Sequence, residues 1–426
     1  MEIAMIAIFV IGYLFIAFEH SIHINKAASA LITGVLIWAV YIMSGVDYHE
    51  AGHHLLEHLG EISSILFFLI GAMTIVELID SHDGFAIITA KITTTSQRKL
   101  LLIVCVLTFF FSATLDNLTT TIVMVSLLRK LIADRDTRLF FVGMVVVSAN
   151  AGGAWSPIGD VTTTMLWIGN QITAPHVVVH LIIPSLVCMI VPLAFVLLRM
   201  KGEVKRPKIM MDVESMITTV KERNFIFYAG VAGLLFVPIF KTVTHLPPFM
   251  GMLLSLGVLW VITERMHRNK NEEDKHELSV INALKKIDVA SVLFFLGILV
   301  AIASLQTNGS LRTLAEAMDR TLGNVDIILM AIGLLSAIVD NVPLVAAAMG
   351  MYDLATYPTD SYFWTFLAYC AGTGGSALII GSAAGVAAMG MERIDFFWYL
   401  KRIAFLALIG YFAGAFTFMF FEKVVF

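Results

Sequence analysis

The stretch SATLDNL at residues 112–118 has a near copy, SAIVDNV, at residues 336–342. The two stretches lie 224 positions apart, and each places an Asp-Asn pair in the middle of an apolar region. Three other matches recur at almost the same offset: Gly-Gly at 152 and 374, Gly at 159 and 381, and Phe-Phe-Leu at 67 and 294. Matches at nearly one offset indicate that the chain is built from two copies of one unit.

The composition places this chain in a membrane. Of its 426 residues 58% are apolar and 14% are charged, whereas a soluble domain has about 25% charged residues. This excludes a soluble enzyme, a nucleic-acid binder and a disordered chain, and it leaves a polytopic membrane protein in contact with lipid. The net charge is −4, and the three cysteines are too scattered for a disulfide framework or a metal cage.

The apolar pattern predicts an all-α polytopic protein of about ten transmembrane spans. Four regions are apolar but broken, at 100–128, 138–171, 326–351 and 361–391. Unpaired backbone at membrane depth must be buried in protein or line a cavity, so 100–128 and 326–351, with halves of about a dozen residues, are expected to be re-entrant hairpins. The other two are expected to be unwound helices. Clear spans are expected at 3–18, 29–44, 62–79, 177–198, 224–240, 248–263, 289–305 and 403–421.

The basic residues predict the orientation. Cytoplasmic loops carry an excess of Lys and Arg, and both termini then lie outside with the two hairpins inserted from opposite sides. Loop 306–325, with Arg312 and Arg320, is the one feature that fits this arrangement poorly. We expect inverted-topology repeats at 1–200 and 224–426, a cytoplasmic linker at 201–223, and a binding site at the repeat interface. The basic loops are 91–99, 129–138, 199–223, 265–288 and 392–402, and the poor ones are 45–61, 241–247 and 352–360.

Asp116 and Asp340 are the central candidates for function. A carboxylate at the bilayer centre costs ~2.5–3.5 kcal/mol on insertion scales, so a partner must offset that cost. Apart from Arg138 at the edge of region 138–171, no Lys or Arg lies within the hairpins or the broken spans. The remaining partners are a proton and a metal ion, and their competition for the same oxygens is the simplest exchanger. The alternative is that both Asp-Asn pairs only cap helices.

Neighbouring oxygen atoms suit a hard cation. The second copy has Ser382 where the first has Asp160, so we expect the two halves to differ in charge. The serine hydroxyls could instead bond to their own helices, and the asparagine before the first Gly-rich break could serve packing alone. The candidate ligands besides the two aspartates are Ser112, Asn117, Asn150, Gly159, Asp160, Thr162, Ser336, Asn341, Gly381 and Ser382.

Other titratable residues carry weaker predictions. Glu77, followed by Asp80, is either a buried proton carrier or a side chain that reaches water at a helix end. His82 could titrate near neutrality. Residues 49–53 match the HExxH pattern of zinc proteases, but Gly52 weakens the required helix and no clear third ligand follows. A short extracytoplasmic loop over 49–58 is expected, either solvated or as a surface helix that packs Leu55, Leu56 and Leu59 on the membrane.

Three stretches carry a family resemblance: FFLIGAMTIVE at 67–77, SATLDNLT at 112–119 and SPIGDVTT at 156–163. They resemble NhaD-type Na⁺/H⁺ antiporters, of a superfamily that includes arsenite permeases and divalent-anion/sodium symporters. The resemblance implies a homodimer with a scaffold and a moving transport domain, sodium sites at the hairpin tips and unwound loops, and no catalysis or cofactor. It also implies outward transport of Na⁺, and usually Li⁺, against inward protons, in a bacterial inner membrane.

One departure from the superfamily bears on the substrate. The anion symporters carry Ser-Asn-Thr at each tip, and this chain has Asp116-Asn117-Leu118 and Asp340-Asn341-Val342 there. A hydroxyl becomes a carboxylate at each tip, which favours a cation. The rival prediction is an arsenite or organic-anion transporter, which would need thiol or cationic groups near the tips.

Overall fold

The computed structural model describes residues 2–17, 19–89, 91–207 and 217–424, and the predicted linker 201–223 is therefore described only in part. The described residues form helices and no β-strand beyond an isolated bridge between Ser96 and Glu203. Nine of the described helices are long and apolar enough to cross a membrane. An all-α polytopic membrane protein is thus confirmed.

Continuous helices cover all eight clear spans of the prediction. The last of them, α22, continues a short α21 through one π-helical turn at Leu400–Ala404. Shorter helices α2 (Glu19–Ile22), α5 (Ala86–Thr89), α13 (Glu272–Glu277) and α14 (Val280–Lys286) lie in connections. The continuous helices are α1 (Glu2–Ala17), α3 (Lys26–Met43), α4 (Tyr48–Ser81), α10 (Ala174–Arg199), α11 (Val220–Thr244), α12 (Pro248–His267), α15 (Val289–Thr307) and α21–α22 (Phe396–Tyr399, Phe405–Val424).

The four broken regions each hold two helices with an interruption at the predicted place. Asp116 separates one pair, and Asp340 caps the second helix of another. The predicted arm length of about a dozen residues is wrong for the first hairpin, because its arms have 19 and 15 residues. The pairs are α6 (Gln97–Leu115) and α7 (Asn117–Leu131), α8 (Arg135–Ala154) and α9 (Val161–Ile168), α17 (Val325–Leu335) and α18 (Asn341–Met351), and α19 (Tyr362–Gly374) and α20 (Ala383–Glu392).

Helix α4 corrects the predicted loop at 45–61. It runs unbroken for 34 residues, because Asp47 accepts hydrogen bonds from the backbone amides of His49 and Glu50 and starts the helix well before the apolar span. At 1.5 Å per residue its length is roughly 51 Å, well beyond the ~30 Å of hydrocarbon. The His-rich segment is therefore an extension of a long helix.

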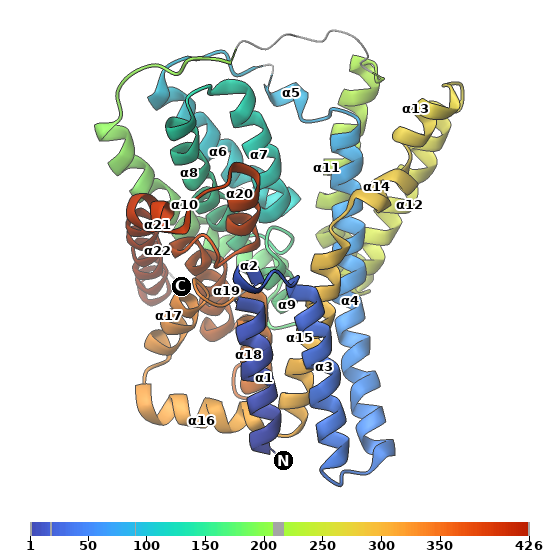
Figure 1. The fold of residues 1–426 in the computed structure, drawn as a ribbon, viewed down its shortest axis with the longest axis vertical. Helices are drawn as coiled ribbons and strands as arrows, with labels where there is room; N and C mark the ends of the chain where they lie inside the picture. The colour runs from blue at the N-terminus through green and yellow to red at the C-terminus, as the bar shows by residue number, and fades with distance from the viewer. Residues whose placement is uncertain (1, 18, 90, 208–216, 425–426) are drawn as a thin grey trace.

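The predicted loop at 306–325 is also wrong. Residues Ser310–Leu322 form helix α16, which buries Leu311 and Ala315 and leaves Arg312 and Arg320 exposed. Such an amphipathic helix suits the surface of a membrane, where its charged side chains reach water. In Figure 1, α16 runs across the lower end of the molecule, roughly perpendicular to the long helices. Its arginines therefore belong to a surface helix rather than to a loop.

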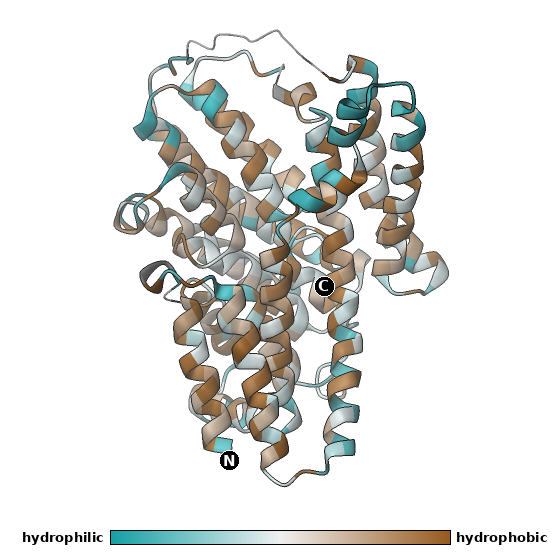
Figure 2. Ribbon diagram, turned by 45° about the vertical axis from the view of Figure 1, so that its right-hand side comes forward, coloured by the Kyte–Doolittle hydropathy of each residue, from teal (hydrophilic) through white to brown (hydrophobic). Residues whose placement is uncertain are grey.

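The long helices gather into two groups (Figure 1). We call them the α4 bundle (α1, α3, α4, α11, α12 and α15) and the α8 bundle (α6–α10 and α17–α22). Within the α4 bundle, α3 lies along the lower half of α4 and α1 lies on the other side of α3, while α11 and α12 lie along the upper half of α4. Hydrophilic residues concentrate at the upper end of Figure 2, the end at which α13 and α14 lie. The basic connection that contains these two helices thus lies opposite α16.

Each half of the sequence contains the same close contact between two glycines. Gly153 lies against the carbonyl of Gly159, and Gly375 lies in the same way against Gly381, with no room for a Cβ atom at either glycine. The residues of each pair lie 222 positions from their counterparts. Only glycine permits so close an approach of backbone to backbone, so both halves require glycine for the same reason.

Candidate functional site

The Asp-Asn pairs at the two predicted hairpin tips each place an aspartate at a helix start, which is compatible with ion binding as well as with capping alone. Asp116 caps α7, because Oδ1 accepts the amide of Thr119 at 2.8 Å and Oδ2 accepts its hydroxyl at 2.9 Å. Asp340 caps α18, with the amide of Val342 at 3.3 Å. The backbone differs, since Asp116 has φ of 73° and Asp340 has φ of −46°. A non-glycine residue at positive φ is strained, and such strain gathers at functional sites.

Lys26 corrects the argument that Asp340 lacks a basic partner. Its Nζ lies 3.3 Å from Oδ2 of Asp340, with exposures of 19% and 14% for the two side chains. Lys26 lies outside the hairpins and broken spans, because it is the first residue of α3 in the other bundle. No equivalent ion pair reaches Asp116 in the part of the chain that the structure describes.

The asparagines of the tips point to a common polar centre. Asn117 donates to Oδ1 of Asn150 at 3.2 Å. Asn150 in turn donates to the hydroxyls of Ser376 and Ser382, both at 2.9 Å. Asn150 therefore bridges the first hairpin to the Gly-rich break of the second half. It is fully buried, so these bonds satisfy its amide away from water.

Asp160 is the carboxylate of this centre. It is 2% exposed and caps α9, with Oδ1 accepting the amide of Thr162 at 3.2 Å. Its Oδ2 lies 3.5 Å from the amide nitrogen of Asn341, the asparagine of the second tip. The hydroxyl of Thr162 is buried without a partner. The carboxylate and this hydroxyl therefore lie together at the start of α9, next to the break.

The two serines before the tips use their hydroxyls on carbonyl oxygens. Ser112 donates to Ala149 at 2.5 Å, and Ser336 donates to Gly333 at 2.7 Å with Ala371 at 3.4 Å. For Ser336 the first bond is to the carbonyl three residues earlier, as the structural alternative predicted. Each hydroxyl oxygen keeps acceptor capacity.

The two glycines of the breaks also lie beside the hairpins. A Cβ atom on Gly159 would lie 2.7 Å from the carbonyl oxygen of Ser112, and one on Gly381 would lie 2.6 Å from that of Ala337. Each break is therefore packed directly against the hairpin of its own half. Backbone carbonyls of the breaks and hairpins meet at these points.

Two cavities approach the centre from opposite ends. The larger, of about 600 Å³, is lined by Lys26 of the α4 bundle and by Thr119 of the first hairpin. Glu77 and Asp80 line it as well, so neither reaches the polar centre itself. Glu77 lies 3.7 Å from Lys286 in an ion pair. The second cavity, of about 410 Å³, is lined at the other end by residues of α9 and α18 such as Ile168 and Met349.

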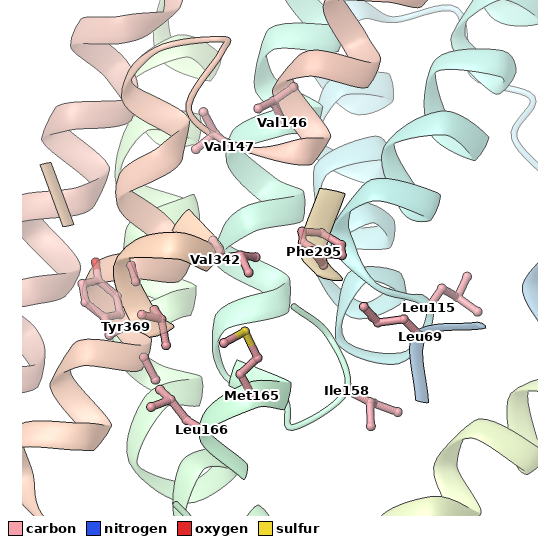
Figure 3. Close-up of a cluster of buried hydrophobic side chains, with 14 of the residues drawn as sticks. Leu69, Leu115, Val146, Val147, Ile158, Met165, Leu166, Phe295, Val342 and Tyr369 are labelled. Atoms are coloured by element: carbon pink, nitrogen blue, oxygen red, sulfur yellow. The ribbon is translucent and has the colours of Figure 1, made fainter. Parts of the chain in front are cut away.

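Apolar side chains surround the tips (Figure 3). Leu115 precedes the first tip and lies beside Leu69 of α4, while Val342 and Phe295 lie near the second tip. All four are buried. An apolar lining of this kind excludes water from the charged groups and thereby strengthens their electrostatic interactions.

The His-rich extension of α4 does not build a metal site. His58 is hydrogen bonded to Thr307 at 3.2 Å. No group of three or more His, Cys, Asp or Glu side chains suited to a metal ion occurs among the described residues. His82 lies apart from this extension, buried at the end of α4, with its Nε2 at 2.9 Å from Nε2 of His267.

The profile of a family described as "Citrate transporter" matches residues 13–366 of this chain. The chain is also 30% identical to a protein named Na(+)/H(+) antiporter NhaD from Alkalimonas amylolytica, over 96% of this chain and 88% of that protein. The chain belongs to the NhaD-type antiporter family. This confirms the resemblance seen in the three motif stretches, and it confirms a transporter rather than an enzyme.

Plant proteins are similar to this NhaD-type chain as well. Sodium/proton antiporter 1 of Arabidopsis thaliana is 48% identical over 97% of this chain and 71% of its own length. Sodium/proton antiporter 2 of the same plant is 45% identical over 97% of this chain and 98% of its own length. The family thus extends beyond bacteria, and a bacterial inner membrane does not follow from membership alone.

Sequence reasoning missed two residues of the site. Lys26 precedes an apolar span, and nothing in its spacing shows that it meets a residue 314 positions away. Ser376 directly follows Gly374-Gly375, and its place in a predicted break is the sequence feature that could have identified it.

Proposed function

We propose that this chain is a secondary transporter that exchanges Na⁺ for protons. The observation that carries the proposal is Asp160, a carboxylate 2% exposed among amide and hydroxyl groups, without an ion pair to any described basic residue. A buried carboxylate needs a cation or a proton. Relatives named as sodium/proton antiporters support the same pair of ions.

The charge near the tips favours a cation over an anion. Asp116, Asp160 and Asp340 supply three carboxylates, and Lys26 supplies one ammonium group that is already paired. A citrate or arsenite ion would meet a net negative site with no free cationic group to bind it. The rival function, suggested by the name of the matching family, is disfavoured for this reason.

We assign the exchange to Asp116 and Asp160, with the amides of Asn117 and Asn341 and the hydroxyl of Thr162 as further oxygen ligands. Thr119, whose hydroxyl donates to Asp116, lines the larger cavity. When Na⁺ binds, the carboxylates are ionised; when a proton binds, the ion is released. Li⁺ would use the same oxygens, since it too is a hard cation.

An elevator motion fits the arrangement of the helices. The α8 bundle carries the hairpin tips and the breaks, and it would move against the α4 bundle as a scaffold. The larger cavity reaches the first tip from the predicted cytoplasmic end, which supports loading of Na⁺ from the cytoplasm in this state. Two inverted repeats, supported by the matched glycine contacts, would supply the opposite state. A homodimer and a bacterial inner membrane stay predictions of the resemblance.

The test uses purified protein in proteoliposomes with a trapped pH dye and an imposed proton gradient. We expect NaCl and LiCl to move protons, and KCl, succinate and arsenite to have no effect. Asp160→Asn, which keeps the α9 cap because Asn caps as well as Asp, should abolish the response. Sodium-dependent uptake of succinate or arsenite, without proton movement on cations alone, would overturn the proposal.

A further inference from the structure

Lys26 stands at the start of α3 with its backbone fixed. Asn25 caps the helix by accepting the amide of Ala27 at 2.8 Å, and Glu19 accepts the amide of Lys26 at 3.2 Å. In Figure 1 the start of α3 lies about half-way along α4, at the level of α9. The lysine is therefore held near the polar centre and away from both ends of the molecule.

The Lys26 side chain turns away from open solvent. Its ammonium lies 3.3 Å from Oδ2 of Asp340 and 4.3 Å from the centre of the Phe294 ring. A lysine that anchors a helix end would extend its ammonium to water, whereas this one is 19% exposed. The ring and the carboxylate together hold the positive charge in place.

Two polar side chains next to Asp340 at the second tip are directed elsewhere. Asn341 turns toward Asp160, and the hydroxyl of Ser336 donates to backbone carbonyls. Oδ1 of Asp340 caps α18. Oδ2, the oxygen that does not cap the helix, is paired with Lys26.

The equivalent place at the first tip lacks a charge. At the offset that relates the paired glycines, 222 positions after Lys26, α12 begins at Pro248. Met252, one turn further along α12, lines a small cavity together with Asp116. One tip thus faces a thioether and the other faces an ammonium group.

From these contacts we infer that Lys26 is a tethered cation that occupies Asp340 in place of Na⁺, so that each chain binds one Na⁺, at the polar centre. The inference rests on the proposed exchange and adds its stoichiometry. Because Lys26 belongs to the α4 bundle and Asp340 to the α8 bundle, the pair also joins the two parts that would move. Removal of the lysine opens Asp340 to the cavity of about 600 Å³ that Lys26 lines.

The test is a double-mutant cycle on the full-length protein, with Lys26→Met, Asp340→Asn and the double variant. Equilibrium binding of radioactive Na⁺ gives the ions per chain, and the proteoliposome assay gives the exchange rate. We expect one Na⁺ for the wild type and for Lys26→Arg, and two for Lys26→Met. Exchange should fall at least tenfold in Lys26→Met and stay within threefold in Lys26→Arg. The double variant should return to one Na⁺.

Several outcomes would overturn the inference. One is a single Na⁺ in Lys26→Met with exchange like the wild type, and another is strictly additive effects in the cycle. If Lys26→Met does not fold, Lys26→Gln replaces it in the double-mutant cycle, because the amide keeps a hydrogen bond to Asp340 without the charge. A wild type that moves no protons on addition of Na⁺ would instead defeat the proposed function, so the two failures are distinguishable.

Discussion

The two hairpin tips share the Asp-Asn pair and differ in what surrounds it. Asp116 has a strained backbone and faces apolar side chains, whereas Asp340 has a relaxed backbone and an ion pair to Lys26. Both asparagines point to the common centre, Asn117 to Asn150 and Asn341 to Asp160. The comparison shows that both copies of a repeated motif can keep the same helix-capping role while their carboxylates have different neighbours.

Of the two tips, the one expected to have the larger effect on exchange is the first, tested by Asp116→Asn. The cap of α7 survives, and a charged ligand is lost, so Na⁺-driven proton movement should fall by about 100-fold, equal to roughly 3 kcal/mol. The assay is proton movement in proteoliposomes. The matched control is Asp134→Asn at the exposed start of α8, where Thr137 donates to the carboxylate and holds the pKa of Asp134 below its ordinary value. That control should transport like the wild type, and equal losses in both variants would remove the special role of the first tip.

When stability is measured instead of exchange, Asp340→Asn should be more damaging than Asp116→Asn. It leaves the ammonium of Lys26 without its carboxylate, which costs about 3 kcal/mol for a largely buried pair. Exchange should fall by about tenfold, which is less than in Asp116→Asn. Thermal unfolding in detergent would show the lower midpoint for Asp340→Asn, and a lower midpoint for Asp116→Asn would contradict this comparison.

Gly153→Ala and Gly375→Ala test where the two halves are alike. Each new Cβ would press on a backbone carbonyl, of Gly159 or Gly381, which cannot move aside easily. We expect similar losses of stability, about 1–3 kcal/mol each. Gly52→Ala in α4 meets nothing within 4 Å and should stabilise the helix by up to about 1 kcal/mol. Thermal unfolding of the three variants is the measurement. If the two halves pack differently, the losses of stability in Gly153→Ala and Gly375→Ala will be unequal.

The smallest expected effect is that of His53→Ala, remote from both tips. The side chain lies on the helical extension of α4, and surface changes alter stability by at most about 0.5 kcal/mol. Exchange should stay within about twofold of the wild type. Loss of exchange comparable with that of Asp116→Asn would show that the His-rich segment takes part in transport.

The sequence allowed the breaks in the helices to be predicted well. Asp-Asn pairs and Gly-rich stretches inside apolar runs leave few other structures, because exposed backbone is costly in lipid. The start of α4 was not predicted, since a single cap at Asp47 extended the helix through a polar segment. The partner of Asp340 was not predicted either, because Lys26 and Asp340 meet only through packing between distant helices.

The hydrogen bonds of Asn150 bear on the ion selectivity of the proposed site. Its amide hydrogens are taken by Ser376 and Ser382, and its oxygen already accepts from Asn117. Under the proposed function, an arriving ion would therefore use the second lone pair of this oxygen or displace one of these hydrogen bonds. If the proposed function holds, the cluster would favour a small ion that leaves these hydrogen bonds in place, because a large ion such as K⁺ would hold the oxygens apart. Selectivity would then be lost first in variants that loosen this network, ahead of any loss in rate.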